Sequence, residues 1–368
     1  MDINIKNNSG QNVFAVIFGL NESNEWCIYK DNKLNITYTG ETTQKFFYSL
    51  SGTSNSINLT DFPHLSSAVI LFSYNEFPKV FNVVPDGTGK PSIQSPPFTP
   101  NSGDANTIFN MVEFTNNASG LNVDTTNVDY YSTPISINLI GVDSGKNPYN
   151  KSAGTMNYTR EGIFEKYDKD TQSTPFNKLI MKDSEKNYVR ILGPQHGVEA
   201  GFIDKGIYDD YVNLCWNKYK KESITIVTSL NTYTGTVDKS DNFCFTEKGK
   251  TDVLYKIPKP GTKKAFDIFG CCNSLAAPNN EQGAIVARIG AALNRTILHN
   301  NETQPFCNSD NFYPTETSYP TNLYSKILHE CYLRGNGYAF PFDDVCNVFS
   351  SDMGCTYPSE FNIVLDKF

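Results

Sequence analysis

The chain has 368 residues, of which 39% are hydrophobic, with 25 Phe and 21 Tyr, so we expect a globular protein with two packed domains. Its formal net charge of −8 argues against nucleic-acid binding, which depends on Lys and Arg side chains that neutralise phosphates. Purely apolar runs such as residues 68–72 are far shorter than the roughly 20 residues that cross a bilayer, so we expect no membrane segment.

Residues 1–145 carry short runs of strand-forming residues separated by turn residues, at the spacing typical of an all-β sandwich or barrel. The expected strands cover residues 3–7, 12–18, 25–30, 35–39, 45–50, 68–74, 80–84, 108–115 and 136–142. No helical period is present in this part. Residues 85–104 are rich in Pro, Gly and Ser, which predicts a loop that could wall a groove next to the following strand.

Beyond residue 150 the pattern changes to mixed helices and strands. Residues 206–221 place apolar side chains at helical spacing, and Trp216 on this helix is expected in the core. A strand is expected at 222–230, followed by helices at 283–298 and 322–335. The C-terminal part, from residues 337–345 onward, is expected to return to β-structure.

The most informative acidic residues lie around a predicted hairpin. Glu113 lies in one strand-forming run, residues 116–120 break that run, and Asp129 lies in the next. Glycoside hydrolysis requires one carboxyl group that protonates the leaving oxygen and a second that activates water or attacks the sugar. We therefore expect both acids on paired strands of one hairpin, whereas Asp124, an odd number of positions from Asp129, is expected to be a turn acid.

Residues beside this pair are candidate substrate-binding groups. Thr115 shares a strand face with Glu113 because side chains alternate along a strand, and Thr126 is a candidate to line the same groove. Tyr130 and Tyr131 must point to opposite faces of the strand, so at least one of them is expected in the core. Tyr130 is our candidate to stack on a sugar ring.

Other chemistries have weak support. Residues 87–92 do not complete a phosphate-binding loop, because Val84 and Pro91 stand where that motif needs Gly and Ser or Thr. His196 and Glu199 could form part of a metal site, but the chain has four His and no third ligand is evident. We therefore expect no metal and no cofactor.

Compartment is indicated only indirectly. The sequence begins MDINIKNNSG without the basic start, apolar core and cleavage site of a signal peptide, so either a leader was removed or the protein is cytosolic. The nine cysteines are odd in number, and Cys331, Cys346 and Cys355 cluster near the end, which suggests local disulfides in an oxidising compartment. We expect a secreted protein, with a cytosolic location as the alternative.

Residues 112–135, VEFTNNASGLNVDTTNVDYYSTPI, resemble the acidic-cleft region of the thaumatin-like proteins and, more closely, that of glycoside hydrolase family 64, the β-1,3-glucanases. In that family a Glu in an EFT or EYT motif and an Asp 16 positions later are the catalytic acids, and here 129 − 113 = 16. Further segments resemble successive family motifs in family order: FDIFGC (266–271), GAIVARIGAALNRTIL (283–298), PTNLYSKILHE (320–330) and GYAFPFDDV (337–345).

The resemblance implies a mainly β plus α/β fold. Residues 1–145 would form a thaumatin-like β-sandwich or barrel completed by C-terminal strands in 336–368. Residues 146–335 would form an inserted mixed α/β domain, with a wide groove between the two. In the last segment, Asp343 and Asp344 resemble paired acids of the thaumatin-like proteins, and we expect a structural hydrogen-bonding role for them.

The resemblance also implies an activity: endo-acting, inverting hydrolysis of β-1,3-glucan, with Glu113 as general acid and Asp129 as general base. Asn117 matches a groove position of the family, although it also begins a glycosylation sequon. We expect a monomer whose partner is the polysaccharide. The alternative is a thaumatin-like glucan-binding or defence protein without catalysis.

Overall fold

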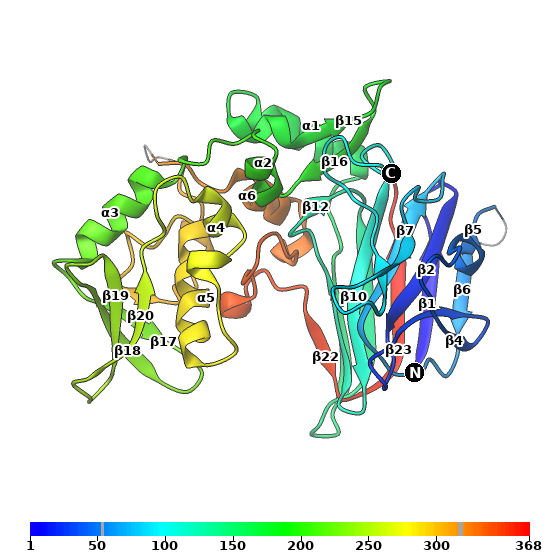
Figure 1. The fold of residues 1–368 in the computed structure, drawn as a ribbon, viewed down its shortest axis with the longest axis horizontal. Helices are drawn as coiled ribbons and strands as arrows, with labels where there is room; N and C mark the ends of the chain where they lie inside the picture. The colour runs from blue at the N-terminus through cyan, green and yellow to red at the C-terminus, as the bar shows by residue number, and fades with distance from the viewer. Residues whose placement is uncertain (53–54, 316–318) are drawn as a thin grey trace.

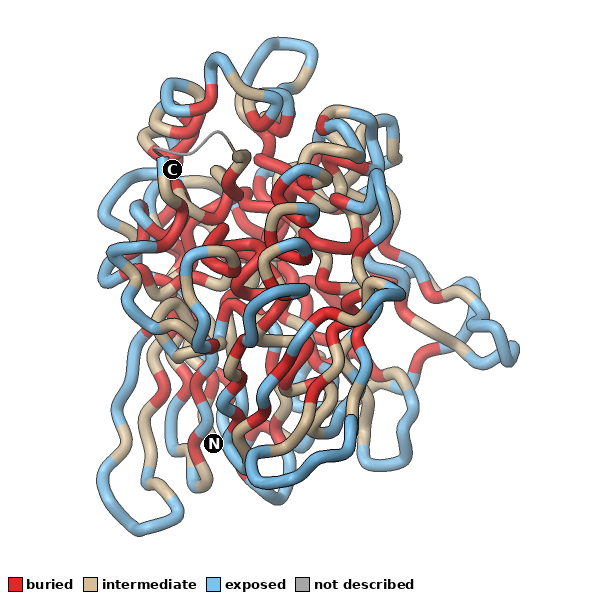
Figure 2. Tube along the Cα trace, turned by 90° about the vertical axis from the view of Figure 1, so that its left-hand side faces the viewer, coloured by how far each residue is buried: buried red, intermediate tan, exposed pale blue. Residues whose placement is uncertain are grey.

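The computed structural model describes residues 1–52, 55–315 and 319–368. These residues form a mainly β protein with helices concentrated in the second half of the chain (Figure 1). In Figure 2 the buried residues run through the interior of the molecule, and exposed residues lie mostly on the peripheral loops. No helix within the described ranges is long and apolar enough to cross a membrane.

The first sheet joins the two ends of the chain. The C-terminal strand β23 pairs in parallel with the N-terminal strand β1 and antiparallel with β13, so it lies inside the sheet (Figure 1). In spatial order the five strands are β14 (Pro148–Ala153), β13 (Ile135–Val142), β23 (Tyr357–Leu365), β1 (Asp2–Asn7) and β6 (Ser56–Leu59).

The second sheet has eight strands and packs against the first. Its spatial order is β22 (Met353–Cys355), β11 (Gly120–Thr125), β10 (Phe109–Asn117), β7 (Leu65–Tyr74), β2 (Val13–Leu20), β3 (Trp26–Lys30) and β4 (Lys33–Ile36), with β5 (Tyr48–Leu50) paired to β2. Side chains from both sheets form one buried cluster, to which β23 contributes Phe361 and β10 contributes Val112 and Phe114. Burial of these apolar surfaces stabilises the sandwich.

The opposite face of the second sheet is only partly covered. A second cluster lies on this face, where Phe109 at the start of β10 packs with residues of the two-stranded ribbon β8 (Asn82–Pro85) and β9 (Pro91–Gln94). Farther along β10, alternation brings Glu113 and Thr115 to this same face, where they line an open pocket instead of a core. The uncovered part of this face is therefore where a site can form.

The helical half has two smaller sheets and its own large core. One sheet consists of β12 (Tyr130–Tyr131), β16 (Tyr188–Leu192) and β15 (Ile180–Lys182). The other consists of β20 (Val253–Pro258), β19 (Asn242–Glu247), β18 (Thr232–Val237), β17 (Ile224–Val227) and β21 (Thr303–Gln304). The helices are α1 (Arg160–Thr171), α2 (Pro194–Glu199), α3 (Asp209–Tyr219), α4 (Ala265–Phe269), α5 (Glu281–Asn294) and α6 (Leu323–Cys331). Short 3₁₀ turns cover Gln44–Phe46, Pro175–Leu179, Asn273–Leu275, Ser309–Asn311, Leu333–Gly335 and Val345–Asn347.

The expected elements are confirmed for the most part. Each of the nine predicted strands of the N-terminal part overlaps an observed strand, and α3, α5 and α6 coincide with the three predicted helices. Trp216 is fully buried, as expected. Helices α1, α2 and α4 were not predicted. The strand expected at 337–345 is wrong, because this segment consists of turns, with Phe342 at a positive φ of 66°.

The disulfide differs from the expected local clustering. Cys346 is bonded to Cys307, which lies 39 positions earlier, whereas Cys331 and Cys355 are free and buried. The three clustered cysteines lie on different elements, α6, the 3₁₀ turn at Val345–Asn347 and β22, so proximity in sequence did not bring them together.

Candidate active site

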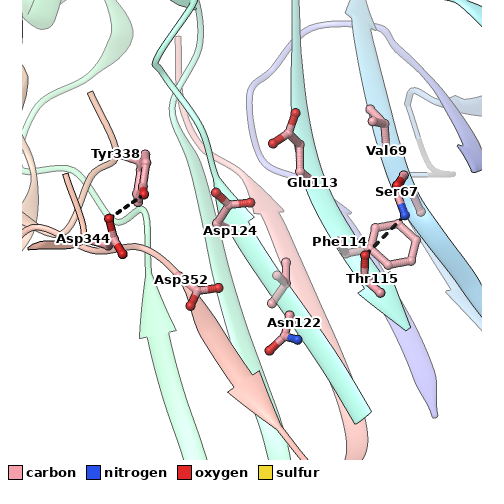
Figure 3. A pocket seen from close by; sticks show the side chains of 12 residues that line it. Ser67, Val69, Glu113, Phe114, Thr115, Asn122, Asp124, Tyr338, Asp344 and Asp352 are labelled. Atoms are coloured by element: carbon pink, nitrogen blue, oxygen red, sulfur yellow. Dashed lines mark hydrogen bonds between the residues drawn. The ribbon is translucent and has the colours of Figure 1, made fainter. Parts of the chain in front are cut away.

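An acidic pocket of about 490 Å³ opens on the uncovered face of the second sheet (Figure 3). Its walls come from β7, β10 and β11 and from the C-terminal segment that follows α6. The lining residues are Ser67, Ala68, Val69, Glu113, Phe114, Thr115, Asn122, Val123, Asp124, Tyr338, Asp344 and Asp352. Among these described lining residues there are four carboxyl groups and no Lys or Arg, so the pocket suits a neutral polar ligand better than an anionic one.

Glu113 lies on the floor of this pocket. Its neighbours in the strand, Val112 and Phe114, are buried in the sandwich core, so alternation directs Glu113 outward. The side chain is accessible from the pocket, but surrounding protein displaces part of its water. This desolvation raises the pKa of Glu113, and the negative charge of Asp129 raises it further.

The partner of Glu113 across the hairpin is Asp124, not Asp129. In the β10–β11 register, Glu113 pairs with Asp124 and the strand ends at Thr125. Figure 3 shows both carboxyl groups at the same pocket. The expectation that Asp124 is a turn acid is therefore wrong. Burial, then the charges of Glu113 and Asp352, raise the pKa of Asp124 to about 7.

Asp129 lies beyond the hairpin, in the bend that leads to β12. After β11 the chain leaves the sheet: Thr126 forms an isolated bridge with Tyr338, and the backbone N–H of Gly193 donates to the Asp129 carbonyl at 2.7 Å. The expectation that Glu113 and Asp129 lie on paired strands of one hairpin is therefore wrong. Asp129 nonetheless lies near enough for its charge to act on Glu113.

His196 is the direct partner of the Asp129 carboxylate. It lies on α2, and its Nε2 is 2.9 Å from Asp129 Oδ1, while its Nδ1 is 3.4 Å from Glu199 Oε2. The Asp129 side chain remains 42% exposed, whereas that of His196 is 17% exposed. Burial disfavours the charged ring, but the hydrogen bonds and charges of Asp129 and Glu199 outweigh it, so the pKa of His196 is raised.

Tyr130 does not offer a platform for a sugar ring. It is 3% exposed, with Phe98 and Phe109 at ring centroid distances of 4.8 and 5.6 Å and the Arg190 guanidinium over its face. The prediction of a stacking role is therefore wrong, because the ring is buried among these neighbours. Tyr131 is fully buried in the core of the helical half, whereas Tyr130 belongs to the cluster on the face of the second sheet. The two tyrosines therefore point to opposite sides, as expected, but both are core residues.

The remaining candidate binding residues are dispersed. Thr115 lines the pocket, and its Oγ1 accepts a hydrogen bond from Ser67 N at 3.2 Å. Asn117 is exposed two positions farther along β10 and lines a separate hollow with His64. Thr126 is half-buried outside the lining of the Glu113 pocket, and its Oγ1 lies 3.4 Å from Val128 N. Of the three, only Thr115 is in direct contact with the pocket of Glu113.

Three groups of the C-terminal segment complete the pocket. Tyr338 and Asp352 were not predicted, and the structural role expected for Asp344 is wrong, because its side chain is exposed in the pocket lining; the buried Asp343 alone has that role. The hydroxyl of Tyr338 donates to Asp344 Oδ1 at 3.0 Å, which places both side chains at the rim, and Asp352 lies next to them (Figure 3). Burial, followed by the charge of Asp344, raises the pKa of Asp352. Within the described ranges, no cluster of three or more His, Cys, Asp or Glu is arranged to hold a metal.

Comparison with known proteins identifies the family. A sequence profile described as beta-1,3-glucanase, that of glycoside hydrolase family 64, matches residues 1–365. The chain belongs to glycoside hydrolase family 64. It is 31% identical over 289 residues to a glucan endo-1,3-beta-glucosidase of an Arthrobacter species, strain YCWD3, an overlap of 77% of this chain and 49% of that relative. The chain thus spans about half the length of this relative.

Solved structures of family 64 have the same fold. A laminaripentaose-producing beta-1,3-glucanase in complex with laminaritetraose superposes with a TM-score of 0.86 at 27% identity, covering 100% of this chain and 98% of that one. A family 64 beta-1,3-glucanase domain from Clostridium beijerinckii gives a TM-score of 0.82 at 22% identity, with the same coverage, and supports the fold alone.

Proposed function

We propose that the chain is an endo-acting β-1,3-glucanase that hydrolyses its substrate with inversion. The observation that carries the proposal is the different environment of two carboxyl groups. Partial desolvation at the open pocket and the charge of Asp129 raise the pKa of Glu113, whereas the Asp129 carboxylate has His196 as an imidazole partner. Environments of this kind separate an acid that keeps its proton from a base that has lost it.

In the proposed reaction, the Glu113 carboxyl protonates the glycosidic oxygen as the bond to the anomeric carbon breaks. Asp129 accepts a proton from a water molecule that attacks the opposite face of the same carbon. The product has the inverted anomeric configuration, and Glu113 and Asp129 exchange protons with solvent to begin again. Because the pKa of Glu113 is raised, its protonated form persists to higher pH than that of an ordinary glutamate.

The sugar chain would bind along the polar floor of the pocket. Thr115 and Asn122 are cross-strand neighbours that line it, and their side chains can hydrogen-bond hydroxyl groups. Thr126 and Asn117 lie on either side of this pair, toward Tyr338 and toward the hollow near His64. An extended glucan that reaches these positions passes over Glu113.

The proposal includes the organisation of the chain. We assign residues 1–145, completed by strands of 336–368, to a thaumatin-like β-domain, and residues 146–335 to an inserted α/β domain with the substrate groove between them. The separate hydrophobic clusters support this division. We also propose a monomer that acts outside the cell, which the Cys307–Cys346 disulfide favours.

The test is incubation of the protein with laminarin and chromatography of released oligosaccharides, with NMR of the first-formed anomer. Glu113→Gln and Asp129→Asn should each lower kcat by about 10²–10⁴-fold, because each removes a proton-transfer group. Glu360→Gln is the matched control, since Glu360 is an exposed strand glutamate on the other sheet and should leave kcat unchanged. Folding of all variants is checked by circular dichroism.

Retention of the anomeric configuration would contradict the inverting mechanism. Binding of the wild type to insoluble β-1,3-glucan without release of sugar would support the non-catalytic binding protein in place of the hydrolase. Wild-type rates in Glu113→Gln would remove Glu113 from the role of general acid.

A further inference from the structure

The contact between Asp129 and His196 joins two distant parts of the chain. Asp129 precedes β12, and His196 lies 67 positions later on α2. The same α2 turn holds the backbone of Asp129, because Gly193 N donates to the Asp129 carbonyl at 2.7 Å. Both the main chain and the side chain of Asp129 are therefore held by one short segment.

We propose that His196 is a positioning residue for the reaction: it holds Asp129 Oδ1 and, as a cation, offsets the repulsion between Asp129 and Glu113. This inference rests on the proposed function of Asp129 as general base. It gives His196 a role in the distribution of charge between two neighbouring carboxyl groups, which the hairpin itself does not provide.

The geometry of the ring supports the cationic form. Nε2 faces Asp129 Oδ1 at 2.9 Å and Nδ1 faces Glu199 Oε2 at 3.4 Å. Ionised carboxylate oxygens only accept hydrogen bonds, and the imidazolium is the form of histidine that donates from both nitrogens. Phe98 also packs against the His196 ring in an edge-to-face contact, at a centroid distance of 4.8 Å, which restricts the orientation of the ring.

The hydrogen bond occupies one oxygen of the carboxylate. His196 contacts Oδ1, and the Asp129 side chain is 42% exposed, so Oδ2 can accept a proton from water. A general base must be held within hydrogen-bond reach of its proton donor, and a misplacement of about 1 Å can cost on the order of 100-fold in rate. Orientation of Asp129 through Oδ1 is thus a direct contribution to the reaction.

The charges around this pair are mostly negative. Asp129 and Glu199 face His196, and Glu113 lies beyond Asp129, while Tyr130 and Tyr324 next to Asp129 are buried phenols whose pKa values are raised by burial. A positive ring at this position offsets the repulsion between Asp129 and Glu113. Its removal leaves that repulsion without compensation, so the acidic limb of the pH–rate profile should move to higher pH.

The experiment compares kcat and KM on laminarin from about pH 4 to 9 for three variants. His196→Gln keeps a donor without the charge, and His196→Phe keeps a ring against Phe98 without donor or charge. His299→Gln is the control, because His299 lies after α5 with Asn300 as its side-chain partner. Thermal melting is recorded for each.

We expect His196→Phe to lower kcat about 10- to 100-fold with KM within about twofold. His196→Gln should retain more activity but show its acidic limb shifted upward by about one pH unit. The control should match the wild type in both respects. Melting temperatures should stay close to the wild-type value.

The outcomes separate the two proposals. If the wild type turns over and both His196 variants keep its kcat and pH profile, the positioning role is overturned while the hydrolase stands. Lower kcat with an unmoved pH profile and a lower melting temperature would show a merely structural histidine, and would also overturn it. If the wild type itself releases no sugar, the proposed function fails and this inference fails with it.

Discussion

At the scale of single residues, the pocket holds more carboxyl groups than a two-acid mechanism needs. Asp124 lies across the strand from Glu113, and burial together with the charges of Glu113 and Asp352 raises its pKa to about 7. Functional sites commonly retain such unfavourable charges at a cost in stability. Asp124 should therefore make folding depend on pH.

The pH dependence follows from the raised pKa. An unfolded aspartate has a pKa of about 3.9, so between about pH 4 and 7 the folded protein holds a proton that the unfolded chain has released. The stabilisation that protonated Asp124 gives the folded protein is complete below about pH 4 and is lost as the pH rises through about 7. Asp124→Asn should be more stable than the wild type at pH 8, by about 1–3 kcal/mol, and similar to it at pH 4, measured by urea unfolding. A variant less stable than the wild type at pH 8 would contradict this assignment.

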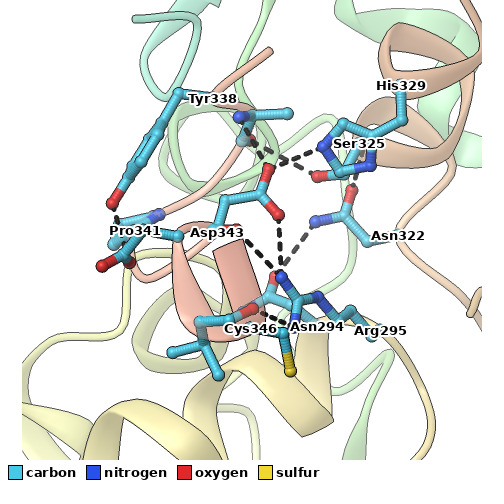
Figure 4. A network of polar contacts seen from close by, with 12 residues as sticks. Asn294, Arg295, Asn322, Ser325, His329, Tyr338, Pro341, Asp343 and Cys346 are labelled. Carbon is cyan, nitrogen blue, oxygen red and sulfur yellow. Dashed lines mark hydrogen bonds and ion pairs between the residues drawn. The ribbon is translucent and has the colours of Figure 1, made fainter. Parts of the chain in front are cut away.

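At the scale of elements, the segment that carries Tyr338 and Asp344 has no regular secondary structure and depends on a buried polar network (Figure 4). Asp343 is fully buried, with its Oδ2 at 2.6 Å from His329 Nε2 on α6 and its Oδ1 at 3.3 Å from Arg295 after α5. Its Oδ2 also accepts from Ala339 N at 3.0 Å. The network thus anchors one wall of the pocket to both helices.

Asp343→Asn should destabilise the protein by about 3–5 kcal/mol, because it leaves the buried Arg295 without its ionised partner. Asp344→Asn is the matched neighbour: Asp344 is exposed at the pocket rim, so its replacement should change stability by no more than about 0.5 kcal/mol. Chemical denaturation of both variants measures the difference. Equal stability of the two would show that the network does not hold the segment.

At the scale of the whole molecule, the last strand completes the first sheet. β23 lies between β1 and β13, and its inward residues Phe361, Ile363 and Leu365 are fully buried. The N-terminal half of the chain therefore cannot complete its sandwich until the C-terminal strand has been added. Such long-range pairing links both ends of the protein in one folding unit.

Removal of residues 357–368 should abolish the folded state, since it opens the first sheet and exposes the core between the sheets. Circular dichroism and thermal melting of the truncated chain measure this, with Glu360→Gln in the full chain as a control that keeps the strand. A truncated protein that melts at the wild-type temperature would show that the sandwich does not need β23.

The local pattern of the sequence was sufficient for much of the fold. Alternation correctly placed Thr115 on the same strand face as Glu113, and it directed Tyr130 and Tyr131 to opposite sides. The error at Asp124 came from the position of the turn. The break predicted at 116–120 did not define which residues form the turn, and in the observed hairpin Asn117 pairs with Gly120, which brings Asp124 opposite Glu113.

The sequence by itself determined the strands of the N-terminal part, the helices α3, α5 and α6, the family motifs and the face of β10 that Glu113 shares with Thr115, because these depend on neighbouring residues and on strand or helix periodicity. Only the tertiary structure decided which groups surround the acids. His196 reaches Asp129 from 67 positions away, Asp344 reaches the pocket from the far end of the chain, and Cys346 pairs with Cys307. These contacts depend on how separate elements pack together, and no local period encodes that packing.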